Sequence, residues 1–192
     1  MPGYVKRQLN KYKHVSSPRP QNCPYSPEPK KYGSEAQSLL PIDTSPQLND
    51  KGIKHVQKIP GSILYYARAG DMMVLMSLST IASEQMKGTE QMMEKVLQVL
   101  NYLATHPDAT VRFRASDMVR NIHSDASYLT EPHSRSRASG YFFLGWLLVD
   151  GKPICLNGAF HTLCSILQFV VSSATKAELG ALILNCQEGM IF

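Results

Sequence analysis

The sequence predicts an α+β fold in which a small helical unit precedes antiparallel strands and one last helix. Apolar residues recur at helical spacing over residues 60–105, and after Pro107 the apolar period shifts to two. A basic, proline-rich segment precedes both patterns. We therefore expect a largely extended, poorly ordered arm over residues 1–59, a helical unit over 60–106 and a strand-rich domain over 107–192.

Composition and charge bound the class of protein. The chain has 192 residues, of which 43% are hydrophobic and 18% charged, so a buried core is expected. The first 60 residues hold ten lysines and arginines against four acids, a net charge of +6, whereas the remainder carries −1. A basic segment favours a polyanion such as nucleic acid, and a solvated arm explains the same charge equally well.

The arm is expected to be a connector, because seven of the twelve prolines fall between Pro18 and Pro46. Lys30 and Lys31 in this stretch are candidate nucleic-acid contacts, although disorder is the simpler account. The four cysteines form no C-x-x-C pair, and no histidine stands at zinc-finger spacing, which indicates a reduced intracellular protein. The N-terminus MPGYVKRQLN lacks the apolar region of a secretory signal, and the run YFFLGWLLV is too short to span a membrane.

Capping residues frame the expected helices. A dense apolar run opens at Pro60, Asp71 is a good N-cap for MMVLMSLSTIASEQM, and Thr89 is one for EQMMEKVLQVLNYLAT. The last run carries a methionine-rich apolar face that could line a partner groove, but core packing is commoner. Near the C-terminus, Ser172 or Ser173 is expected to cap a helix whose apolar face holds Leu179, Leu182 and Ile183.

The expected strands lie between these helices. ATVRFRA, DMVRNIHSDASY and RASGYFFLGWLLV are strand-like, Asp150-Gly151 is a hairpin-turn signal, and KPICLNGAFHTLCSIL is the returning strand or strands. Asp125 stands in the middle of one strand, where aspartate is disfavoured. It marks either a solvated strand end or a position that chemistry requires. His123 shares its face.

The blocks SDASYLTEPHSRSRASGYFFLG, NGAFHTLCSI and SSATKAELGAL resemble the ribonuclease H region of copia-type retrotransposon polyproteins. Upstream, DKGIKHVQKIPGSILYYARA, STIASEQMKGTEQ and NYLATHPDATVRFRASDM resemble the end of the reverse transcriptase portion and its connection. The resemblance covers essentially the whole chain, and the blocks occur in family order. It implies that the strand-rich domain is an incomplete ribonuclease H-like domain.

The resemblance also implies a chemistry. Ribonucleases H cleave RNA in RNA–DNA hybrids with two divalent metals, Mg²⁺ or Mn²⁺, held by carboxylates. Asp125 matches the first metal-binding aspartate of the family, and Glu178 matches its second catalytic carboxylate. The bland alternatives are a solvated strand end and an ordinary exposed helix glutamate. Arg135 and Arg137, which follow Asp125, are candidate phosphate contacts or plain loop surface.

Departures from the family weaken the expected activity. The family uses a third aspartate on a strand after the Glu178 helix, and the polymerase aspartate pair is also missing from this chain. The Asp125 strand is therefore expected to keep an unpaired edge, which favours aggregation. Three hypotheses follow: a remnant that is inactive without the remaining parts of the polyprotein, a weak metal-dependent hybrid nuclease, and a non-catalytic nucleic-acid-binding module that uses the basic arm.

Overall fold

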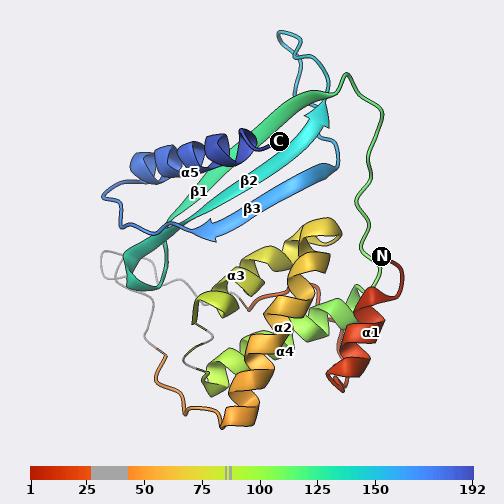
Figure 1. Ribbon diagram of the computed structural model, residues 1–192, viewed down its shortest axis with the longest axis vertical. Coiled ribbons are helices and arrows are strands. Elements are labelled where there is room, and N and C mark those ends of the chain that lie inside the picture. The colour runs from red at the N-terminus through yellow and green to blue at the C-terminus, as the bar shows by residue number, and fades with distance from the viewer. Residues whose placement is uncertain (27–42, 85, 87) are drawn as a thin grey trace. The chain divides into compact units, whose positions relative to one another are not determined.

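The computed structural model describes residues 1–26, 43–84, 86 and 88–192, and these form two compact units that divide between Thr110 and Val111 (Figure 1). One unit is helical, and the other holds a three-stranded antiparallel sheet and a helix, so the expected α+β class is confirmed. Lys30 and Lys31 lie outside the described residues. None of the described helices is long and apolar enough to cross a membrane.

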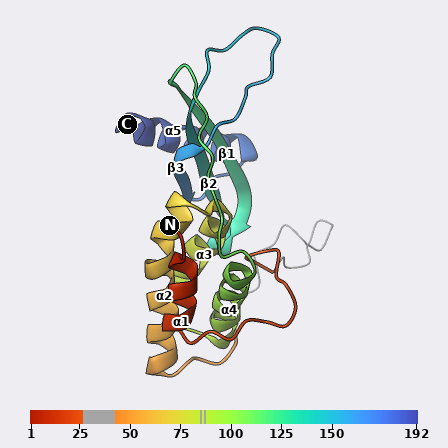
Figure 2. The same cartoon turned by 90° about the vertical axis from the view of Figure 1, so that its right-hand side faces the viewer.

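The helical unit contains four helices and a short 3₁₀ turn, which Figure 2 shows from the side: α1 (Tyr4–Lys11), α2 (Asp50–Ala69), η2 (Met72–Val74), α3 (Leu75–Glu84) and α4 (Glu90–Thr105). Its core is made by the apolar faces of the three longer helices, including Ile63 of α2, Leu78 of α3 and Leu100 of α4, each at most 1% exposed. Met92 is buried in the same core, as the core-packing interpretation of the methionine stripe expects.

The expectation of an extended arm over residues 1–59 is wrong for two stretches, which are helical. Residues 4–11 form α1, whose Val5 is fully buried and whose Tyr4 stacks on Tyr66 with ring centroids 5.9 Å apart. Residues 50–59 form the first half of α2, where the Asn49 side chain caps the helix by accepting from the Gly52 amide at 2.9 Å. Long-range packing of α1 and the Asn49 cap escaped a prediction based on proline content.

Helix α2 also continues through Pro60, where the sequence led us to expect an element to begin. Proline inside a helix removes one backbone hydrogen bond and strains the preceding turn. Pro60 and its neighbours Ile59 and Ile63 are buried, so the apolar face of α2 stabilises the helix against this loss.

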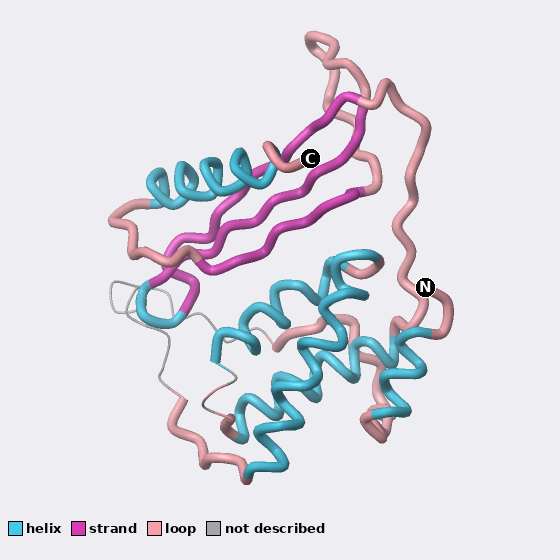
Figure 3. The backbone as a smooth tube through the Cα atoms, viewed as in Figure 1, coloured by secondary structure: helices cyan, strands magenta, loops and turns pink. Residues whose placement is uncertain are grey.

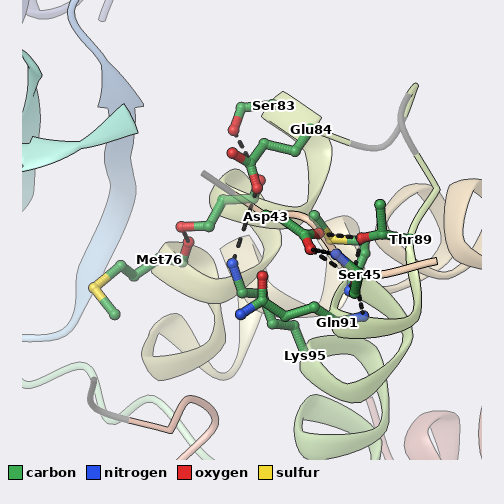
Figure 4. A network of polar contacts seen from close by, with 10 residues as sticks. Asp43, Ser45, Met76, Ser83, Glu84, Thr89, Gln91 and Lys95 are labelled. Carbon is green, nitrogen blue, oxygen red and sulfur yellow. Dashed lines mark hydrogen bonds and ion pairs between the residues drawn. The ribbon is translucent and has the colours of Figure 1, made fainter. Parts of the chain in front are cut away.

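A polar network fixes the start of α4 (Figure 4). The Asp43 carboxylate accepts hydrogen bonds from the Ser45 amide at 2.8 Å, the Ser45 hydroxyl at 2.6 Å and the Thr89 hydroxyl. Thr89 is the N-cap, as expected, and the Gln91 amide donates to Ser45 Oγ at 3.1 Å. Burial acts to raise the pKa of Asp43, but these hydrogen bonds and the charge of Lys95 outweigh it and lower that pKa. The network therefore stabilises the ionised form of Asp43.

The second unit is a sheet of order β1-β2-β3 followed by one helix: β1 (Val119–Glu131), β2 (Arg135–Gly145), β3 (Ala159–Ile166) and α5 (Ala174–Gly189). A short 3₁₀ turn, η3 (Pro132–Ser134), joins the first two strands. Both neighbouring pairs are antiparallel, and Asp125 lies opposite Ser139. Helix α5 lies against one face of the sheet, over β1 and β2 (Figure 3). Ser173 is its N-cap, which was one of the two expected choices.

Two expected strand segments are irregular in the structure. The alternating run over 110–115 pairs with no described strand, and β2 ends at Gly145, which leaves Leu147 and Leu148 exposed. The reason is Asn157, whose side chain bonds the Arg114 amide and carbonyl, each at 2.8 Å, and the Leu144 carbonyl at 2.7 Å. This one carboxamide satisfies backbone groups that a strand ladder would otherwise pair.

The face of α5 that packs on the sheet is not the one we expected. Leu179, Leu182 and Ile183 are about half exposed, at 56%, 49% and 52%. The buried stripe instead consists of small or polar residues four apart, namely Ala177, Ala181, Asn185 and Gly189. Small side chains let the helix backbone approach the sheet closely, and this approach decides which face turns inward.

Candidate metal site on the sheet

The positions of α5 and β1 define which strand residues face the helix. The Asn185 side chain donates to Ser124 Oγ at 2.9 Å, and Ala126 packs against the cluster that contains Ala181. Side chains alternate along a strand. Ser124 and Ala126 therefore face α5, and Asp125 between them lies on the opposite face of the sheet.

Asp125 occupies an exposed, polar position. Its side chain is exposed, and its backbone carbonyl accepts from Ser139 Oγ on the neighbouring strand at 3.3 Å. His123 lies on the same face, with its ring edge on Phe143 at a centroid distance of 5.3 Å. The surroundings of Asp125 thus provide solvent and a hydroxyl, but no second carboxylate from the helix.

Glu178 stands on α5, directly after Ala177 of the buried stripe, and is exposed. The strand and the helix contact each other, as expected, yet the two carboxylates lie on different sides of the β-sheet layer. Across the described ranges, no three His, Cys, Asp or Glu side chains are grouped so that they could hold a metal ion. The residues present therefore do not fit a two-metal centre, and the metal role of Asp125 and Glu178 stays a prediction.

The two candidate phosphate contacts differ in their surroundings. Arg135 is partly exposed at the start of β2. Arg137 is only 5% exposed, and its Nε donates to Glu131 Oε1 at 2.7 Å while Nη1 contacts Cys164 Sγ at 3.4 Å. Burial acts to lower the pKa of Arg137, but Glu131 outweighs this effect and the pKa is raised. Arg137 therefore has a buried partner within the sheet, which leaves Arg135 as the accessible cation of the two.

The sequence interpretation missed the residue that joins α5 to the sheet. Asn185 is fully buried, and its Nδ2 donates to Ser124 Oγ at 2.9 Å and to the Ser139 carbonyl at 2.8 Å. A Cβ atom on Gly140 would lie 1.9 Å from Asn185 Oδ1, so only glycine fits there. The spacing of Ala177, Ala181, Asn185 and Gly189 was the signal that could have revealed this face.

A basic surface lies on the helical unit. The cations of α1, Lys6, Arg7 and Lys11, are exposed, and the helix sequence YVKRQLNK contains no acid. The Tyr12 hydroxyl donates to the Lys58 carbonyl at 3.2 Å, which brings the end of α1 beside α2 and its exposed lysines. This arrangement concentrates positive charge on one folded surface.

Comparison of the chain with family models, curated proteins and solved structures finds no match.

Proposed function

We propose that the chain is a fragment of a copia-type retroelement polyprotein, from the end of its reverse transcriptase region and part of its ribonuclease H region. Two features support the proposal. The sequence blocks that resemble this family occur in family order along the chain. The fold beneath the last three blocks is three antiparallel strands followed by a helix that packs on the first two, as the resemblance implies.

We further propose that this fragment does not cleave RNA–DNA hybrids by itself. The observation that carries this conclusion is the placement of Asp125 on the sheet face away from α5, while Glu178 stands on α5. Two-metal hydrolysis needs carboxylates that converge on both ions. Two carboxylates separated by the sheet layer cannot hold such a pair.

A cleavage assay tests the proposal. The full chain is incubated with a labelled RNA–DNA hybrid and Mg²⁺, and separately with Mn²⁺, beside the variants Asp125→Asn and Glu178→Gln. We expect the same background for all three proteins. Cleavage by the parent chain that both substitutions abolish would sink the inactive-fragment proposal and support residual catalysis instead.

A second candidate function is nucleic-acid binding without catalysis. It is favoured by the exposed cations Lys6, Arg7 and Lys11 on α1. Phosphate contacts by such cations give affinity without sequence preference, and that affinity depends steeply on salt. Deleting the first 60 residues would cut α2, so point substitutions on α1 are the cleaner test.

A further inference from the structure

Strand β1 is an edge strand. It pairs with β2 on one side, and within the described ranges no other element makes a backbone hydrogen bond to it. Its regular pairing extends from Val119 to Ser127, before a bulge. An edge of this length presents a row of free backbone donors and acceptors that can pair with another strand.

The side chains along this edge carry opposite charges two residues apart. His123 and Asp125 are both exposed on the face away from α5, and the strand is flanked on its other face by Ile122, Ser124 and Ala126. A strand with such a pattern can complement itself in an antiparallel pair, because the two-fold axis reverses the order of the charges.

The alignment with Ser124 opposite itself satisfies both faces. It places Asp125 of each copy opposite His123 of the other, which gives two Asp–His contacts, and it places Ile122 opposite Ala126 on the face that α5 covers. Centring the pair on Asp125 would set the two aspartates against each other, and centring it on His123 would set the two histidines together. Charge therefore selects the alignment centred on Ser124.

We propose that β1 is a self-association edge, at which two copies of this chain join their sheets by antiparallel β1–β1 pairing centred on Ser124. The proposal goes beyond the function proposed above and is independent of the family resemblance. Leu182 of α5 stands about half exposed, at 49%, and would gain burial if the second sheet extended below it. The occupant is a second copy rather than a foreign strand, because the charge pattern of the edge complements its own reversal.

Sedimentation velocity of the full chain over a range of concentrations tests the proposal. We expect a monomer–dimer equilibrium in the parent chain. Asp125→Lys sets a lysine against histidine, and His123→Asp sets aspartate against aspartate, so each should weaken the dimer about tenfold. The double variant His123→Asp/Asp125→His restores both opposite pairs and should recover the parent affinity. Asp150→Lys, which makes the same charge change in an exposed turn, is the matched control and should leave the dimer unchanged.

Circular dichroism of each variant separates loss of pairing from loss of fold. A parent chain that stays monomeric at the highest concentration overturns the proposal. Dimers that survive both single substitutions overturn β1 as the interface. A folded double variant that fails to recover overturns the alignment centred on Ser124.

Discussion

Gly140 shows how one residue controls the packing of an element far away in the sequence. It lies on β2 beneath α5, and any Cβ atom there would lie 1.9 Å from Asn185 Oδ1 and 2.9 Å from Phe142 Cε2. Asn185 is fully buried and bonds groups on both β1 and β2. The glycine and the asparagine therefore act together to set the height of α5 above the sheet.

Gly140→Ala is expected to destabilise the sheet unit by about 1–3 kcal/mol, because a methyl group must displace the Asn185 side chain. Gly61→Ala is the control, since a Cβ atom there meets nothing within 4 Å. Gly61 is a helical position in α2, so alanine should instead stabilise by about 0.5–1 kcal/mol. Thermal unfolding of both variants measures the difference, and equal effects of the same sign would contradict the role of Gly140.

Asp71 and Asp43 make opposite predictions about pH. Asp71 is 4% exposed, and burial raises its pKa even though it accepts from the Met73 amide at 3.2 Å. Its ionised form is therefore penalised in the folded state, and the stability it contributes falls as pH rises from the usual aspartate pKa through the raised one. Asp43 has a lowered pKa, so its contribution is present at neutral pH and is lost on acidification.

Asp71→Asn is therefore expected to stabilise the helical unit at pH 7, with a gain that shrinks as pH falls below about 4. Asparagine keeps the side-chain oxygen that caps η2. Asp43→Asn should destabilise at pH 7 and lose its effect in acid. Urea unfolding at both pH values checks the two signs, and a shared sign at neutral pH would refute the argument from burial.

At the scale of elements, the N-caps are where local sequence and structure agree best. The Ser173 side chain accepts from the Lys176 amide at 3.2 Å and begins α5, while Ser172 Oγ contacts only the exposed Lys176 Nζ at 2.9 Å. The hydroxyl of Ser173 thus satisfies a backbone donor that the helix leaves free.

Ser173→Ala should accordingly cost about 1 kcal/mol of stability. Ser172→Ala removes a solvent-exposed contact and should cost almost nothing, which makes it the matched control. Chemical unfolding followed by tryptophan fluorescence measures both, because the single tryptophan, Trp146, lies in the sheet unit. Equal losses in the two variants would show that Ser172 shares the capping role.

At the scale of the whole molecule, the basic charge is a property of a folded surface rather than of an extended arm. We expect the chain to bind single-stranded and hybrid nucleic acid with an affinity that falls as salt rises. The triple variant Lys6→Ala/Arg7→Ala/Lys11→Ala should weaken binding and reduce the slope of log affinity against log salt by about 1 for each phosphate contact removed. Lys152→Ala, an exposed cation of the sheet unit, serves as the control. An unchanged slope in the triple variant would exclude α1 as the contact surface.

Local patterns were sufficient for much of the fold. The caps Thr89 and Ser173, the strand around Asp125 and the α+β class follow from short-range signals of period and capping. The helical state of residues 4–11 did not follow, because it depends on Tyr4 and Val5 meeting α2 more than 50 residues later. The irregular run over 110–115 depends likewise on the distant Asn157.

The sequence by itself determined which residues form strands and helices, and it singled out Asp125 as unusual in its strand. Only the tertiary structure decided which way Asp125 faces. A strand alternates its side chains whatever its context, but the set that faces the helix is chosen by how α5 packs. That packing follows the small stripe from Ala177 to Gly189 and the Asn185 hydrogen bonds rather than the larger leucines, because close approach and satisfied buried polar groups outweigh the burial of Leu179.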